Sequence, residues 1–108
     1  MALTINIRYT GAPGAALAFA REMEASGTAD AVRAEEGNVR YEYFQALADP
    51  DTVLLVDRWT DQAALDAHHD SPMMARIAEL RDKYDLHMSV ERYADADGEG
   101  ADDAFVRR

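Results

Sequence analysis

The order in which two hydrophobic periods follow one another constrains the fold of this chain more than any other feature. Residues 3–9, LTINIRY, alternate apolar and polar side chains, which is typical of a half-buried strand. Residues 14–35 instead repeat apolar side chains every three to four positions, the spacing of an amphipathic helix. Ser26-Gly27 can end or bend this helix, and Gly37 is well placed to stop it.

Two more strands and a second helical stretch complete the pattern. Residues 38–47 and 52–59 read as strands, and the Asp-Pro-Asp between them predicts an antiparallel hairpin. Helical spacing follows over residues 60–84, where Ser71-Pro72 provides a cap and a first helical position for a restart. Residues 86–93 alternate again. The order β-α-β-β-α-β predicts a ferredoxin-like α+β fold, an antiparallel sheet with both helices on one face.

Apolar side chains occupy both faces of the two middle strands. One face carries Val39, Tyr41, Tyr43, Val53, Leu55 and Trp59, and the other carries Phe44, Leu54 and Val56. An antiparallel sheet with one face in water shows a cleaner alternation of apolar and polar residues. The sequence therefore predicts a homodimer whose two sheets pack face to face.

Composition narrows the classes of partner. A net charge of −10 argues against binding to nucleic acid or to an anionic membrane surface, because both need clustered cations. The chain has no cysteine, and no apolar run approaches the roughly 18 residues of a membrane span, so we expect a soluble, cytoplasmic protein. Residues 1–93 are expected to form the domain, and residues 94–108 an acidic, disordered tail.

Three segments carry a family resemblance. AEEGNVRYEY, DRWTDQAALDAHHDSPMM and KYDLHMSVERY resemble the antibiotic biosynthesis monooxygenase family, and within it the quinol monooxygenases. The most specific part is an acid-x-Trp, then D-x-x-A-L-x-x-H, then S/T-P, and the likeness covers residues 3–93. It implies a dimeric α/β barrel and, in the best-known members, oxidation of polycyclic phenols or hydroquinones by O₂ without metal or flavin. The same scaffold also holds isomerases and members without known activity, so the fold does not decide the function.

Carried over residue by residue, the resemblance makes His68 the candidate catalytic base. His68 shares the inward helix face of Ala64 and Leu65, whereas His69 lies nearer the edge of that face and is expected to meet solvent. A neutral imidazole can accept a phenol proton near neutral pH, since its ordinary pKa is about 6.5. The alternative is a half-buried histidine that is hydrogen-bonded to a backbone carbonyl.

Four residues are candidates for substrate binding, and each has a plain structural alternative. Trp59 matches the tryptophan at the end of the third strand and would form a pocket wall, and the alternative, which its large buried area favours, is a plain core aromatic. Tyr41 could donate to a quinone oxygen or simply be a good strand residue. Asn6 could orient a substrate oxygen or point outward, and Met74 could be an accommodating wall or adaptable core.

The sequence thus predicts a cofactor-independent monooxygenase that takes a small aromatic or quinol-like substrate with molecular oxygen as co-substrate. No cofactor is expected. The three histidines lack the H-E-x-x-H type of spacing, so no metal is expected either. Two alternatives stay open. One is a non-catalytic small-molecule-binding or stress-response dimer, and the other is an isomerase that uses His68 without O₂.

Overall fold

Four antiparallel strands form the sheet in a computed structural model that describes residues 1–96, 98, 100 and 102–108. They are β1 (Leu3–Thr10), β2 (Asn38–Gln45), β3 (Val53–Trp59) and β4 (His87–Ala94), in the spatial order β2-β3-β1-β4. The β2–β3 hairpin inserts β3 between β1 and β2, which are connected through helices. This arrangement confirms the predicted ferredoxin-like α+β fold.

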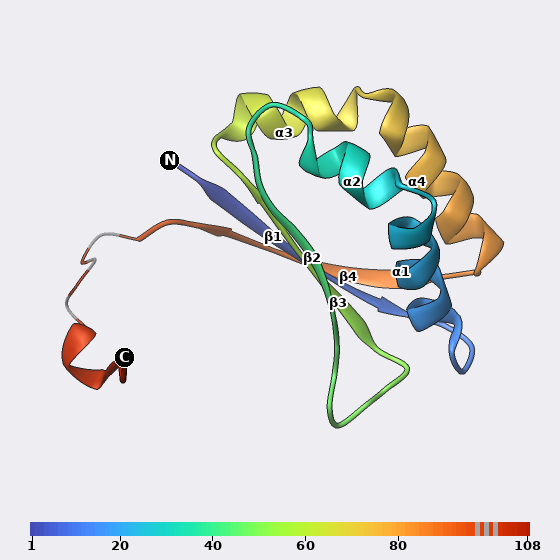
Figure 1. Ribbon diagram of the computed structural model, residues 1–108, viewed down its shortest axis with the longest axis horizontal. Helices are drawn as coiled ribbons and strands as arrows, with labels where there is room; N and C mark the ends of the chain where they lie inside the picture. The colour runs from blue at the N-terminus through green and yellow to red at the C-terminus, as the bar shows by residue number, and fades with distance from the viewer. Residues whose placement is uncertain (97, 99, 101) are drawn as a thin grey trace.

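The four α-helices, α1 to α4, cover one face of the sheet (Figure 1). Each of the two predicted helical stretches is divided at its predicted signal, giving α1 (Ala15–Ala25) and α2 (Thr28–Arg33), then α3 (Gln62–His69) and α4 (Pro72–Lys83). Gly27 makes the first break because it adopts a left-handed φ of 80°, a conformation that costs glycine little. At the second break Pro72 opens α4, with Ser71 as the preceding cap residue.

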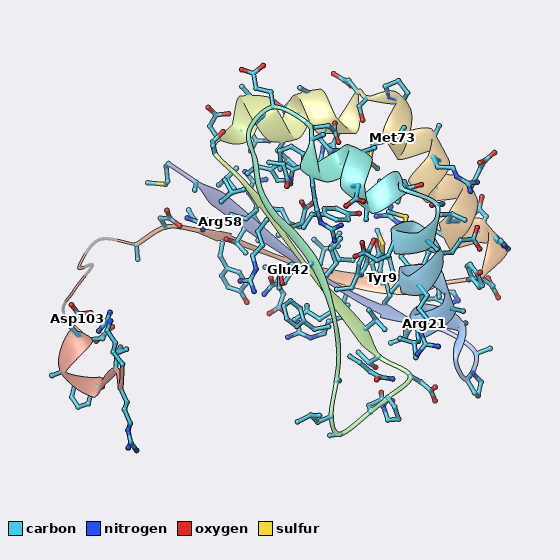
Figure 2. The ribbon with its side chains drawn as sticks, in the orientation of Figure 1. Tyr9, Arg21, Glu42, Arg58, Met73 and Asp103 are labelled. Carbon is cyan, nitrogen blue, oxygen red and sulfur yellow. The ribbon has the colours of Figure 1, made fainter. Side chains whose placement is uncertain are left out.

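The core lies between the helices and the inner face of the sheet. Alternate residues of β1 and β3 are buried there, namely Leu3, Ile5, Ile7, Tyr9, Val53, Leu55, Asp57 and Trp59. Tyr9 packs against Phe19 of α1 with ring centroids 4.9 Å apart. Figure 2 shows Tyr9 between the sheet and the helices, and Arg58 on the opposite side of the sheet. The strand alternation therefore divides the sheet into a helix-covered face and an uncovered face.

The strand ends differ slightly from the predicted ones. β2 stops at Gln45 rather than residue 47 because the turn begins earlier, with the Thr52 hydroxyl donating to Asp49 at 2.6 Å. β4 begins at His87 and runs through Ala94, a residue predicted to belong to the tail. Pairing with β1 extends one step further, since the Asp95 amide donates to the Ala2 carbonyl at 3.3 Å.

Part of the predicted acidic tail can be described. Within it the structure has a short 3₁₀ helix, η1 (Asp103–Phe105). The disorder predicted for the tail concerns in part Asp97, Glu99 and Ala101, which lie outside the described residues. Among the described residues, no helix is both long enough and apolar enough to cross a membrane.

Candidate functional site

A cavity of about 240 Å³ lies between the inner face of the sheet, at its β1–β4 edge, and helices α3 and α4. Its apolar wall consists of Ile5, Ile7, Leu65, Met74, Met88 and Val90, and its polar wall of Asp57, His69, Arg81 and Arg92. The helices leave β4 incompletely covered, so Met88 and Val90 are 47% and 54% exposed. The cavity therefore combines an apolar interior with an open side along β4, as expected of a site for a small organic ligand.

Asp57 is a buried carboxylate in the wall of this cavity. It occupies an inward position of β3, between Tyr41 of β2 and Ile5 of β1, and is only 5% exposed. Trp59 Nε1 donates to Asp57 Oδ1 at 2.7 Å, and this is the one hydrogen bond to that carboxylate from the described residues. Burial raises the pKa of Asp57 to about 7, against the opposing effects of the Trp59 hydrogen bond and the Arg81 charge. Near neutral pH such a carboxylate can both accept and release a proton.

Trp59 and His68 do not line the cavity but lie behind its wall. The two rings stack with centroids 4.7 Å apart at an interplanar angle of 26°, and Trp59 is fully buried. His68 Nδ1 lies 2.8 Å from Glu35 Oε2. The His68 ring and the Glu35 carboxylate therefore form a hydrogen-bonded pair. Burial lowers the pKa of His68, although the Glu35 carboxylate opposes the change.

Glu35, His68 and Trp59 thus form a chain of contacts that ends on Asp57. The residues come from the loop after α2, from α3 and from β3. Trp59 is held in place by the stacked imidazole, and its indole N–H in turn fixes one oxygen of Asp57. No described residue donates a hydrogen bond to the other Asp57 oxygen. Such support behind a reacting group is how proteins fix its orientation.

Arg81 brings a positive charge to the same cavity from α4. Its Nε and Nη2 donate to the Tyr9 hydroxyl at 3.1 and 2.8 Å, and its guanidinium lies 5.5 Å from the centre of the Tyr9 ring. Burial raises the pKa of Tyr9, so this phenol stays neutral and accepts from the arginine. These contacts hold the guanidinium in place without neutralising it.

The five predicted site residues do not all lie at the cavity. Met74 lines the cavity, and Trp59 and His68 lie behind its wall. Tyr41 is 2% exposed on β2, where its hydroxyl lies 3.2 Å from that of Tyr43, and it is not part of the cavity wall. Burial raises the pKa of Tyr41.

Asn6 lies on the other face of the sheet. It pairs with Val56 and Glu91, whose side chains share the uncovered face, so it cannot orient a ligand in this cavity. The reason is strand parity, because Ile5 and Ile7 take the inward positions on either side of it. The outward alternative for Asn6 is therefore the one observed.

Asp57 and Arg81 are the site residues that sequence reasoning missed. A signal for Asp57 was present, because a carboxylate at the third inward position of Val53, Leu55, Asp57 and Trp59 breaks an otherwise apolar face. His69 was correctly predicted to be exposed, yet it is His69, not His68, that lines the cavity. No local signal marks Arg81, whose partner Tyr9 lies 72 positions away.

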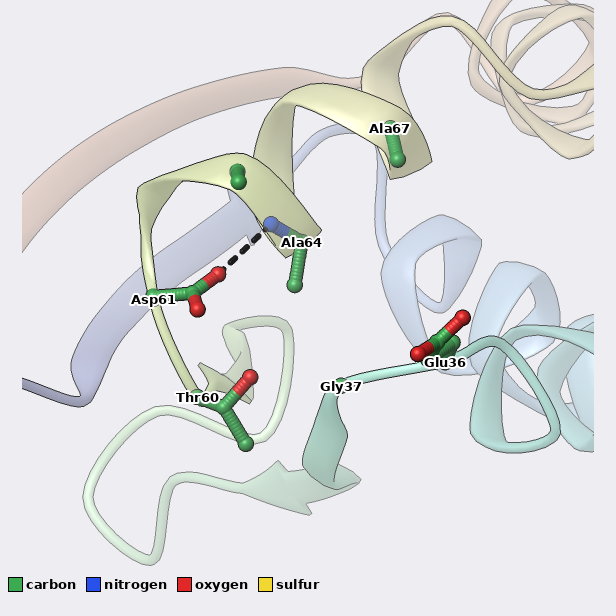
Figure 3. A pocket seen from close by; sticks show the side chains of 7 residues that line it. Glu36, Gly37, Thr60, Asp61, Ala64 and Ala67 are labelled. Atoms are coloured by element: carbon green, nitrogen blue, oxygen red, sulfur yellow. Dashed lines mark hydrogen bonds between the residues drawn. The ribbon is translucent and has the colours of Figure 1, made fainter.

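A second hollow, of about 300 Å³, lies where β2 begins against the start of α3 (Figure 3). Small or exposed residues line it, including Gly37, Thr60, Asp61 and Ala64. The Asp61 carboxylate is already used there, because it caps α3 by accepting from the Ala64 amide at 2.8 Å. This hollow brings together no buried titratable group, so the cavity at β4 is the better candidate site.

The described residues contain no group of three or more histidine, cysteine, aspartate or glutamate side chains arranged to hold a metal ion. What the β4 cavity does present is a buried acid with a pKa near neutrality, two guanidinium groups and an apolar lining. This arrangement can bind a flat organic molecule, take a proton from it and stabilise the resulting negative charge.

Comparison with known proteins agrees with the fold and places the chain in a family. The family model for antibiotic biosynthesis monooxygenase matches residues 2–80. A curated relative, Putative monooxygenase YcnE of Bacillus subtilis (strain 168), is 33% identical over 48 residues, which are 44% of this chain and 50% of the relative. The match thus spans about half the length of that relative.

Solved structures share the architecture over most of the chain. A conserved protein from Methanosarcina mazei Go1 aligns with a TM-score of 0.77 at 21% identity, covering 89% of this chain and 94% of its own. PA3566 from Pseudomonas aeruginosa aligns with a TM-score of 0.73 at 27% identity, covering 88% and 94%. SnoaB, a cofactor-independent oxygenase from Streptomyces nogalater, aligns with a TM-score of 0.71 at 17% identity, covering 92% and 97%. Because the family model matches most of this chain, the chain belongs to the antibiotic biosynthesis monooxygenase family.

Proposed function

We propose that this protein is a homodimeric, cofactor-independent monooxygenase that oxidises a hydroquinone or related phenol with O₂ in the cavity at β4. The observation that carries the proposal is Asp57, a buried carboxylate in an apolar cavity wall whose pKa is raised to about 7. Family membership and the description of SnoaB as a cofactor-independent oxygenase support the reaction class. The proposed reaction needs neither metal nor flavin.

The chemistry starts with removal of a phenolic proton. Asp57 accepts it, and the positive charge of Arg81 favours the electron-rich phenolate that results. The phenolate then transfers electrons to O₂. One oxygen atom joins a ring carbon and the other leaves as water, so a hydroquinone becomes a hydroxyquinone. The substrate itself supplies all four electrons that reduce O₂, and the reaction balances without an external reductant.

Cavity size favours a smaller substrate within the predicted class. Pockets for drug-sized ligands usually hold about 300–1,000 Å³, and this cavity holds about 240 Å³. One or two fused rings are therefore the better fit, and we propose a two-ring hydroquinone such as a naphthohydroquinone rather than a larger polycyclic phenol.

In this proposal His68 acts through Trp59 as a positioning residue, and Asp57 is the base. The sequence-based hypothesis made His68 the base, and it stays the alternative. His68→Gln keeps a hydrogen-bonding side chain but removes the stacked ring. If His68 only positions Trp59, the variant should lose activity while its kcat/KM keeps an acidic limb near pH 7. Loss of that limb would make His68 the titrating base.

Oxygen uptake by metal-stripped protein is the experiment that tests the function. With reduced naphthoquinones as substrates, and after subtraction of autoxidation, uptake should exceed background and should survive an excess of chelator. Turnover of a substrate without O₂ would favour the isomerase. Saturable binding with no turnover at all would favour the non-catalytic binding protein.

The uncovered face of the sheet supports the proposed dimer. Phe44 and Tyr93 are 40% and 50% exposed there, beside the half-buried Leu54 and Val56. Asn6 Oδ1 is buried on this face without a hydrogen-bond partner among the described residues, which costs about 1–3 kcal/mol unless a donor reaches it. A second copy packed sheet to sheet would cover the apolar side chains and could supply that donor.

Light scattering checks the dimer directly. The wild-type protein should have the mass of two chains at micromolar concentration. Val56→Asp would place a carboxylate at the middle of the face, near Glu42 and Glu91, and should shift the mass toward one chain. Leu47→Asp makes the same chemical change in the exposed β2–β3 turn and should leave the dimer intact. A monomeric wild type would overturn the sheet-to-sheet proposal.

A further inference from the structure

The polar groups of the cavity carry an excess of positive charge on a strongly acidic protein. The chain has a net charge of −10, yet Arg81 and Arg92 both line this one cavity. Asp57 is the only carboxylate in the wall among the described residues, and its pKa near 7 leaves it partly protonated at neutral pH. A low-dielectric cavity lined by one sign of charge concentrates ligands of the opposite sign.

These two arginines also differ from most others in the chain. Arg8, Arg33, Arg40, Arg58, Arg76 and Arg108 each form an ion pair with a carboxylate. Neither Arg81 nor Arg92 forms one with any described residue. The protein has 21 acidic residues, yet these two guanidinium groups at the wall of one cavity have no carboxylate as an ion-pair partner among the described residues. They are therefore available to bind an anionic ligand.

Neutral hydrogen bonds hold each guanidinium in place. Arg81 uses Nε and Nη2 on the Tyr9 hydroxyl, which leaves Nη1 without a hydrogen-bond partner among the described residues. Arg92, on β4, donates through Nη2 to the side-chain carbonyl of Gln62 at the start of α3. Both side chains are therefore oriented by uncharged acceptors and keep donors for a ligand. Guanidinium groups match the geometry of carboxylates particularly well.

We propose that the substrate is a hydroxyaromatic acid, whose ring lies against the apolar wall while its carboxylate is bound by Arg81 and Arg92. This inference rests on the proposed function for the identity of the ring and adds the anionic substituent. Asp57 then faces the phenolic hydroxyl rather than the carboxylate, because two carboxylates side by side would repel each other. His69, which also lines the open side, can donate to the same anion.

Equilibrium binding under nitrogen separates this proposal from turnover. The probes are a hydroxynaphthoate and its neutral amide, a hydroxynaphthamide with its substituents at the same ring positions. Calorimetry should show the acid binding at least about tenfold more tightly than the amide, because only the acid forms charge-assisted hydrogen bonds. The difference should shrink at about 0.5 M salt, since Arg92 is exposed and Arg81 is only half-buried.

Three variants assign the preference to the site. Arg92→Gln, a change at an exposed residue, should remove most of the preference for the acid. Arg81→Lys keeps the charge but not the fork, so it should weaken binding of the acid less than Arg92→Gln does. Arg21→Gln removes another arginine that lies outside this cavity and should keep the full preference. Arg92→Gln circumvents the risk that changing Arg81 disturbs the buried Tyr9.

The outcomes distinguish failure of this inference from failure of the proposed function. Equal affinity for acid and amide, or no binding of either, would overturn the anionic subsite even if oxygen uptake with neutral hydroquinones is observed. An acid preference that survives Arg92→Gln would overturn it as well. A preference that depends on Arg92 would support the subsite, even if no hydroquinone is oxidised and the monooxygenase proposal fails.

Discussion

Asp57→Asn is expected to make the protein more stable above pH 7 and at the same time to abolish most of its activity. In the folded protein the pKa of Asp57 is about 7, compared with an ordinary value of about 3.9 in an unfolded chain. The folded state therefore binds more protons between those two values, and its stability falls as the pH rises through that range. Above pH 7 the cost of burying the charge is complete, and asparagine removes it.

The size of the effect follows from the pKa difference. Three pKa units correspond to roughly 4 kcal/mol, and partial relaxation reduces the gain expected from Asp57→Asn to about 2–3 kcal/mol at pH 8. Asparagine can still accept the Trp59 hydrogen bond, so the local packing is kept. Near pH 4 the stability of wild type and variant should converge. Urea unfolding at the two pH values measures the difference.

The same variant should lower kcat/KM for oxidation by about 10²-fold or more, because the proton acceptor is lost. In the wild type, kcat/KM should rise with pH to a plateau above about pH 7, as Asp57 ionises. A residue that is costly to the fold yet needed for turnover is what a functional site predicts. If the variant gained stability but kept full activity, Asp57 would not be the base.

Gly37→Ala should be among the most destabilising single-methyl changes in the chain. Gly37 has a φ of +85°, and an added Cβ would lie 2.4 Å from the Ala64 Cβ and 2.9 Å from the Thr60 hydroxyl oxygen. The left-handed conformation costs alanine roughly 1–2 kcal/mol, and overpacking against α3 adds about 1–3 kcal/mol. We expect a total loss of about 2–5 kcal/mol in the free energy of unfolding.

Gly14→Ala is the matched control for this change. Gly14 has nearly the same φ, +80°, but an added Cβ would meet nothing within 4 Å. It should lose only the conformational part, about 1–2 kcal/mol. The difference between the two variants measures the close approach between the start of β2 and α3. Equal losses of stability would show that the methyl group added at Gly37 fits against Ala64 without an energetic cost.

Local patterns were enough to predict the framework of the fold. The period-two alternation of β1 and β3, the Gly27 break and the Ser71-Pro72 restart each depend on neighbouring residues, so they can be seen in the sequence. Helix phase also separated the two adjacent histidines correctly, with His68 buried and His69 exposed. These features are properties of short segments and need no knowledge of the tertiary contacts.

The site depended on contacts that no short segment contains. His68 meets Glu35 across 33 positions, and Arg81 meets Tyr9 across 72. The prediction made the buried His68 the candidate base, whereas the cavity left by the incomplete cover over β4 is lined by the exposed His69. Which residues line a cavity depends on how far the helices extend over the sheet, and helical periodicity does not encode that extent.

Repeating the oxygen-uptake assay with oxygen-18 gas tests the central claim most directly. A naphthohydroquinone substrate should give a hydroxyquinone that contains one labelled oxygen atom, and the second labelled atom should appear in water. A parallel reaction in labelled water corrects for exchange of the quinone oxygens with solvent. The label should be lost with Asp57→Asn. An unlabelled quinone formed together with hydrogen peroxide would contradict the account, because O₂ would then be only an electron acceptor.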